Sequence, residues 1–350
     1  MEQSREIQTH ETISGHQIFQ IPVEAFPGLW ANVYLVLAGP YQVLIDTGSG
    51  FGDSNEHLMA GFDQIGRLKH HPKFDLAELT HVFITHGHID HFGGLNFVKE
   101  RSPASIGIHE LDRKNLTNHE ERITVVVKSL QQYLVEAGIR PERVDDLVSL
   151  YKLTKSLFHN IPVDITYEAS GMRMRPFEFM HVPGHCAGHV LIRLEDILLV
   201  GDHILPEISP HQAPEQLTLS TGLGHYLESL RRMRPFLSGI RLALGGHQRP
   251  IVNIQERIEE IKKVHADRLN QVLSFLDSPC TVKDISKSLF GEVQGYNILL
   301  AIEETGAHVE YLYQHGMIEI DNLAEFERNN GSSPIFYRRT RALRSEIALG

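Results

Sequence analysis

The stretch THGHIDHFGG, residues 85–94, places four potential metal-binding side chains within six positions. These side chains are His86, His88, Asp90 and His91. The stretch follows the apolar run HVFI (81–84), which predicts a buried β-strand. The four side chains cannot all point one way on a helix or a strand, but a tight loop can bring them to one place. Gly93 and Gly94 would let the next helix begin close to it. Because imidazoles and carboxylates bind Zn²⁺, Fe and Mn, we interpret this stretch as part of a metal site.

Further residues of the same types follow other apolar runs. They are His185 in PGHCAGH (183–189), Asp202 in GDH (201–203) and His247 in GGH (245–247). Seven ligands fit two ions, with His86, His88 and His185 on one, Asp90, His91 and His247 on the other, and Asp202 bridging them. Each ion then keeps room for a shared water, which is typical of a catalytic centre.

The composition is that of an ordinary globular protein. With 350 residues, 41% of them hydrophobic, the chain is long enough for two domains. The net charge of −11 argues against a general affinity for nucleic acids. Only two cysteines are present, and neither a signal segment nor a membrane-spanning apolar run is found. We therefore expect a cytoplasmic protein without a membrane partner.

The order of expected elements suggests two domains. The first, residues 1–255, has strands at 17–23, 32–38, 41–50, 177–184, 188–194, 196–204 and 241–247, a helix at 53–69 and a helical insertion at about 110–160. The second, residues 256–350, has a long amphipathic helix, helices at 281–290 and 296–316, and a hairpin of MIEID and PIFYRR around Asn329, Asn330 and Gly331. Three helices and a terminal hairpin predict a winged-helix-like domain.

The motifs THGHIDHFGG, PGHCAGH, GDH and GGH, preceded by LIDTG (44–48), resemble those of the metallo-β-lactamase superfamily over roughly residues 15–255. The resemblance implies an α+β protein with an αββα sandwich, the metal site at one edge of its two sheets, and the ligand pairing given above. It also implies that Asp46 orients a ligand from outside the coordination shell, and that His189 is structural. Residues 256–350 resemble the winged-helix extension of the lactamase-like protein 2 branch.

The resemblance implies a hydrolase in which a metal-bridging hydroxide attacks the substrate and Asp90 also holds the water. The best-known β-lactamases have a cysteine ligand where this chain has Asp202, which argues against antibiotic hydrolysis. An Asp-bridged site resembles the glyoxalase II and thioesterase-like branches, so we expect a small-molecule ester or thioester substrate; a lactone suits the same chemistry. The helical insertion is either a lid over an apolar acyl group or a packed structural cap.

The main alternative is an endoribonuclease acting on single-stranded RNA, because some winged-helix relatives cut RNA. Against it, the helix at 293–315 contains no Lys or Arg and carries Glu303, Glu304 and Glu310. The basic run Arg338, Arg339, Arg341 and Arg344 is typical of a solvated tail. The C-terminal domain then serves packing or homodimerisation.

A non-catalytic metal-binding protein would require a missing ligand, and all seven are present. His211, in the Pro-rich loop PEISPHQAP, and Tyr226, near the start of a helix, are candidate substrate contacts. A core position is the alternative interpretation of Tyr226.

Overall fold

The computed structural model describes residues 6–70, 75–155, 158–329, 333–340 and 347–349. The chain forms two compact units. The first consists of Met1–Glu120, Leu157–Pro210 and Leu230–Arg257, and the second of Glu121–Ser156, His211–Ser229 and Ile258–Gly350. The second unit thus takes up segments that precede residue 256, and the expected division at that residue stays a prediction.

The first sheet has seven strands, which lie in the order in which they occur in the chain. They are β1 (Gln8–Glu11), β2 (Gln17–Phe26), β3 (Leu29–Ala38), β4 (Tyr41–Ile45), β5 (His81–Phe83), β6 (Ser105–Ile108) and β7 (Ile165–Thr166). Strands β3 and β4 are joined by a turn at Gly39 and Pro40, because Ala38 pairs with Tyr41 in an antiparallel register. From β4 to β7 the strands are parallel, so the loops that follow β4, β5 and β6 leave the same edge.

The second sheet has five strands in the order β12-β11-β10-β9-β8. They are β8 (Arg173–Met174), β9 (Phe177–His181), β10 (Val190–Leu194), β11 (Ile197–Gly201) and β12 (Leu242–Gly245). Strands β11 and β12 are parallel, with Gly201 opposite Gly245. The residues that follow these two glycines therefore leave the sheet side by side.

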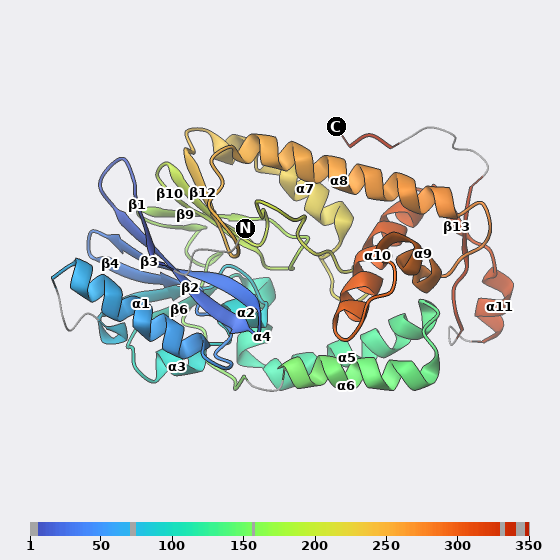
Figure 1. The fold of residues 1–350 in the computed structure, drawn as a ribbon, viewed down its shortest axis with the longest axis horizontal. Coiled ribbons are helices and arrows are strands. Elements are labelled where there is room, and N and C mark those ends of the chain that lie inside the picture. Colours follow the sequence, from blue (N-terminus) through green and yellow to red (C-terminus); the bar gives the residue numbers. More distant parts are fainter. Residues whose placement is uncertain (1–5, 71–74, 156–157, 330–332, 341–346, 350) are drawn as a thin grey trace. The chain divides into compact units, whose positions relative to one another are not determined.

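Two apolar layers hold the first unit together. Phe83 from the first sheet and Phe177 and Phe179 from the second belong to one buried cluster, which forms the core between the sheets. On the other face of the first sheet, helix α1 (Ser54–Leu68) buries Leu58, Phe62 and Ile65 at helical spacing (Figure 1). Full burial of a side chain of this size stabilises the fold by about 1.5–3 kcal/mol.

Short helical segments lie in several connections of the first unit. They are η1 (Leu76–Glu78), α2 (Ile89–Phe92), α3 (Leu95–Lys99), η2 (Glu110–Asp112), α4 (Arg113–Thr117) and η3 (Arg234–Leu237). Helix α2 follows β5, and η2 follows β6 at the same edge of the sheet.

The helices expected in the insertion, at Tyr226 and after about residue 256 are present. They are α5 (His119–Glu136), α6 (Pro141–Lys155), α7 (Leu223–Arg232), α8 (Ile254–Phe275), α9 (Val282–Phe290) and α10 (Asn297–Gln314). Helix α9 begins with a capping box, in which Thr281 and Asp284 each accept the backbone N–H of the other. None of the helices in the described part of the chain is both long and apolar enough to cross a bilayer.

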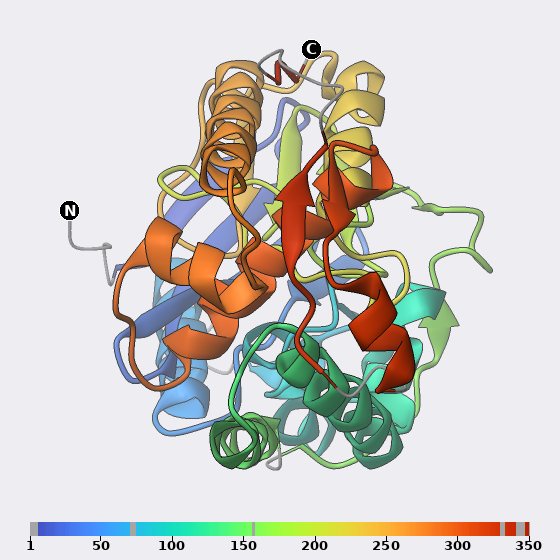
Figure 2. The same ribbon diagram turned by 90° about the vertical axis from the view of Figure 1, so that its right-hand side faces the viewer.

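The expected terminal hairpin is correct in its pairing and wrong in its connection. Strands β13 (Ile318–Ile320) and β14 (Tyr337–Arg339) are antiparallel, but helix α11 (Leu323–Arg328) lies between them in the chain (Figure 2). The strands are therefore not joined by a tight turn, and Asn330, Gly331, Arg341 and Arg344 lie outside the described residues. The winged-helix arrangement of these elements stays a prediction.

Candidate metal centre

The seven side chains singled out from the sequence all lie in the first unit, in the segments that follow its strands. His86 follows β5, His88 directly precedes α2, and Asp90 and His91 lie within α2. The remaining three are His185, in the loop between β9 and β10, Asp202, directly after β11, and His247, two residues after β12.

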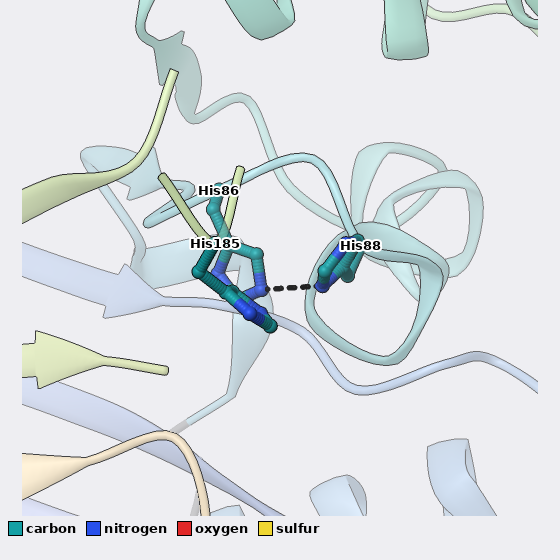
Figure 3. Close-up of side chains that lie close together, drawn as sticks. All are labelled: His86, His88 and His185. Carbon is teal, nitrogen blue, oxygen red and sulfur yellow. Dashed lines mark hydrogen bonds between the residues drawn. The ribbon is translucent and has the colours of Figure 1, made fainter. Parts of the chain in front are cut away.

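His86, His88 and His185 form the first group (Figure 3). Nε2 of His86 lies 3.1 Å from Nδ1 of His88. The ring centroid of His185 is 5.2 Å from that of His86 and 4.5 Å from that of His88. The ligand atoms of all three lie within 4.8 Å of one another, close enough to form a candidate site for one ion.

Asp90, His91 and His247 form the second group. Oδ2 of Asp90 lies 3.7 Å from Nε2 of His91 and 3.4 Å from Nε2 of His247. His91 is fully buried, whereas the side chain of Asp90 is 16% exposed. Solvent can therefore reach this group from the side of Asp90.

Asp202 lies between the two groups. Its Oδ2 is 3.8 Å from Nε2 of His185, 3.5 Å from Nε2 of His91 and 3.2 Å from Nε2 of His247. One carboxylate therefore faces imidazoles of both groups, as a ligand shared by two ions would.

Glycines permit this close packing. A Cβ on Gly246 would lie 2.2 Å from Oδ1 of Asp202 and 2.6 Å from Cε1 of His91. A Cβ on Gly94 would lie 2.4 Å from the carbonyl oxygen of Thr47. The pair Gly93-Gly94 thus lets α2 and α3 approach the loop after β4, and larger residues would push the ligands apart.

Hydrogen bonds to residues outside the seven ligands determine which ring nitrogen of His91 and of His247 faces the centre. Asp46 adopts the left-handed conformation, with φ of 60°, directly after β4. Its Oδ2 accepts Nδ1–H of His91 at 2.8 Å, and its two carboxylate oxygens also accept the N–H and O–H of Thr85. Nδ1 of His247 donates to the carbonyl of Trp30 at 2.6 Å. In the neutral form of both rings, Nε2 then carries the lone pair, which points toward the centre.

The electrostatics favour a cation at this place. Burial disfavours charge on His247, but the Asp202 carboxylate beside it raises its pKa to about 10. Burial likewise opposes ionisation of Asp202, but His247 and His91 hold its pKa well below its usual range. The carboxylates thus draw protons onto neighbouring imidazoles, and a divalent ion would replace those protons.

Some buried polar atoms of the centre lack a hydrogen-bond partner among the described residues. Nε2 of His91 and Oδ1 of Asp202 are in this state. An unsatisfied buried polar atom costs about 1–3 kcal/mol, so such atoms are rare without a ligand. Together with the mixed nitrogen and oxygen donor set, they fit a divalent transition-metal ion.

A supporting residue that the sequence did not reveal is Asp112. Oδ2 of this buried side chain accepts the N–H of Gly87, between ligands His86 and His88, at 2.8 Å. A Cβ on Gly188 would lie 2.7 Å from the Asp112 carboxyl carbon, so Asp112 also packs on the loop that carries His185. The only signal in the sequence is an acidic residue shortly after β6.

His189 supports the shared carboxylate through the backbone. Its Nε2 accepts the N–H of Asp202 at 3.1 Å, and its ring stacks on His86 at 4.7 Å. This contact agrees with the structural role expected for His189.

His211 and Tyr226 lie in the second unit. His211 contacts Glu303 and Glu304, with Nε2 3.1 Å from Oε2 of Glu303. Tyr226 is fully buried and packs against His265. Their part in substrate binding stays a prediction.

Comparisons with known proteins agree with this arrangement. Residues 28–247 match the family model of the metallo-beta-lactamase superfamily. The chain is 25% identical over 249 residues to lactamase-like protein nscB of Neosartorya fischeri, an alignment that covers 70% of this chain and 56% of that protein. The chain thus spans little more than half the length of this relative.

Solved structures resemble the chain over nearly its whole length. The metallo-beta-lactamase family protein TTHA1429 of Thermus thermophilus has a TM-score of 0.72 and 26% identity, covering 92% of this chain and 98% of that one. A beta-lactamase domain protein of Burkholderia ambifaria, at 20% identity, has the same fold, with a TM-score of 0.68 over 95% of this chain and 94% of that one.

The expected αββα fold and family are therefore confirmed. On its matched motifs, its two sheets and its clustered His and Asp side chains, the chain belongs to the metallo-β-lactamase superfamily.

Proposed function

We propose that this protein hydrolyses an ester or thioester with an apolar acyl group, using two divalent metal ions. The observation that carries the proposal is the position of Asp202, whose Oδ2 lies within 3.2–3.8 Å of Nε2 atoms from both ligand groups. His86, His88 and His185 would hold one ion and Asp90, His91 and His247 the other. The nitrogen and oxygen ligands suit zinc, and also iron or manganese.

When bound, the ions would supply Lewis acidity and lower the pKa of water from about 15.7 to about 7. The chain itself provides no serine or cysteine nucleophile in this scheme, because water attacks the acyl carbon. Asp202 and the six other ligands would bind and space the ions, and Asp46 and the Trp30 carbonyl would hold His91 and His247 in the required tautomer.

Asp90 is the residue we assign to the attacking water. Burial opposes its ionisation, but the imidazoles of His91 and His247 hold the pKa of Asp90 well below its usual range. It is therefore a carboxylate at neutral pH. Being partly exposed, it can accept a hydrogen bond from a water molecule and orient it toward the carbonyl carbon.

The preference for an apolar acyl group is supported by exposed side chains close to the ligands. Leu29, which is 43% exposed, precedes Trp30, whose carbonyl accepts the His247 hydrogen bond. Phe51, which is 41% exposed, follows Gly50, where an added Cβ would lie 2.8 Å from the carbonyl oxygen of Gly93. Phe51 also contacts Phe26, with ring centroids 5.9 Å apart. Exposed apolar side chains therefore adjoin, in the chain, backbone that contacts His247 or the residues just after His91.

A substrate panel measured with zinc-loaded protein tests the proposal. Esters and thioesters of increasing acyl length, lactones and single-stranded RNA would be compared by kcat/KM. We expect kcat/KM to rise by up to about fourfold per added methylene, from ~0.8 kcal/mol of buried surface. In the double variant L29S/F51S this rise should flatten. RNA cleavage far faster than hydrolysis of every acyl substrate would overturn the proposal.

The variant D90N tests the assigned role of Asp90. We expect turnover to fall by about 10²–10⁴-fold, the range for a residue that handles the reacting proton. Metal content must be measured in the same preparation, because Asp90 is also a proposed ligand. Near-native turnover at full metal loading would contradict the assignment.

A further inference from the structure

A second buried group of potential metal ligands lies in the second unit, away in sequence from the seven described above. It consists of His265 on α8 and of Glu304 and His308 on α10. Both histidines are fully buried, and Glu304 is 6% exposed. The ligand atoms of the three residues lie within 4.8 Å of one another.

The two imidazoles face each other through ring nitrogens. Nδ1 of His265 lies 3.1 Å from Nε2 of His308. Nδ1 of His308 donates to the carbonyl of Glu304 at 2.7 Å, so its Nε2 carries the lone pair that points at His265. A bond from the other ring nitrogen to a carbonyl is the arrangement usual for a metal-binding histidine.

The spacing also suits a single ion. A tetrahedral ion with bonds of about 2.0–2.1 Å to nitrogen separates two such nitrogens by about 3.3–3.4 Å, close to the 3.1 Å found between His265 and His308. Glu304 and His308 are four residues apart on one helix, which places them on one face. Nε2 of His265 has no hydrogen-bond partner among the described residues, so no bond on that side prevents the ring from adjusting.

The charged residues around His265, Glu304 and His308 include two carboxylates. Glu304 pairs with Arg268 and accepts the N–H of Gln212 at 2.7 Å. Glu303 lies close by, 3.1 Å from Nε2 of His211. Burial opposes charge on His211, but the carboxylates of Glu303 and Glu304 raise its pKa. Among the described residues, these two carboxylates therefore face Arg268 and His211. Burial, the larger cause, and the neighbouring His308 lower the pKa of His265 to about 3, so its imidazole is neutral and able to bind metal at neutral pH.

We propose that His265, Glu304 and His308 bind one divalent ion of the zinc class, separate from the catalytic centre. The ion would join α8 to α10 inside the second unit and so stabilise that unit. It takes no part in hydrolysis.

The test is the zinc content of the full-length protein. Protein stripped with a chelator is loaded with Zn²⁺ alone, desalted, and its zinc-to-protein ratio measured by mass spectrometry. The double variant H265Q/H308Q should hold one zinc ion per chain fewer than wild type. His315 provides the matched control, since it is exposed at the end of α10 and its Nδ1 donates to the carbonyl of Tyr311 at 2.8 Å. H315Q should hold as much zinc as wild type.

The double variant H88A/H185A tests the catalytic centre separately. It should lose zinc from the catalytic centre and keep the zinc ion between α8 and α10. If the proposed hydrolysis fails while H265Q/H308Q still loses one ion, the present proposal stands. Equal zinc content in H265Q/H308Q and wild type would overturn it. Should H265Q/H308Q not fold, a map of anomalous scattering at the zinc edge from wild-type crystals decides: a peak between His265 and His308 supports the proposal, and its absence at full loading refutes it.

Discussion

Replacing Asp46 by asparagine tests whether contacts outside the ligand set control the metal centre. Asp46 accepts three hydrogen bonds of 2.8 Å, from the N–H and O–H of Thr85 and from Nδ1–H of His91. The side-chain carbonyl of the introduced asparagine can still accept the Thr85 N–H. Its NH₂ group then faces Nδ1–H of His91, so two donors meet and His91 is driven to carry its proton on Nε2, where the metal should bind.

The expected size follows from the bond that is lost. A hydrogen bond to a charged group contributes about 1.5–3 kcal/mol, and changes to the partner of a metal-binding histidine typically cost about 10–100-fold in metal affinity or activity. We therefore expect D46N to bind zinc about 10–100-fold more weakly at the group containing His91, and to hydrolyse its substrate correspondingly less at limiting zinc.

Competition with a chromogenic zinc chelator measures this affinity. D196N is the control, because Asp196 is equally buried and accepts bonds from Arg241 at 2.8 Å and from Ile13 at 3.1 Å. D196N should unfold at lower urea concentration and keep the wild-type zinc affinity. Zinc binding by D46N within about twofold of wild type would refute the reasoning.

Three further changes test the supports of the centre. D112A leaves the N–H of Gly87 without its acceptor, so urea unfolding should show a loss of about 1–3 kcal/mol together with weaker zinc binding; wild-type values for both would contradict the role of Asp112. G93A places a Cβ 2.1 Å from the Ser49 carbonyl oxygen, and overpacking against backbone should cost about 1–3 kcal/mol or more. Its control is G224A in α7, where the nearest atom would be 3.9 Å away and stability should hold; equal unfolding midpoints for the two variants would count against the packing argument. Finally, removing zinc with a chelator should lower the Tm measured by calorimetry. Zinc that binds the folded chain and not the unfolded chain adds about 2.7 kcal/mol to the free energy of unfolding at about 100 times its Kd. An unchanged Tm would show that zinc does not bind the folded chain in preference to the unfolded chain.

The metal centre could be foreseen because its ligands occur in short, local motifs. His86, His88, Asp90 and His91 lie within six residues, and Asp202 and His247 each follow a readable apolar strand. Strand periodicity is a local property, so the sheets and the positions of these residues at strand ends follow from it.

Contacts between distant parts of the chain could not be foreseen in this way. In the sequence, Asp112 is an acidic residue after a predicted strand and has no distinguishing pattern. Its hydrogen bond with the N–H of Gly87 forms only because β5 and β6 are parallel neighbours. The same holds for α11, which interrupts an apparent hairpin: a six-residue helix without buried residues has no strong apolar periodicity to reveal it.

The sequence by itself determined the family, the seven candidate ligands and most of the helices and strands, because each rests on residue types and spacings within a short window. Only the tertiary structure decided that Asp112 bonds to the backbone between two ligands and that His265 meets His308 across two helices. The physical reason is that such contacts depend on how separate elements pack. Packing is determined by the whole set of buried side chains, and no local pattern encodes it.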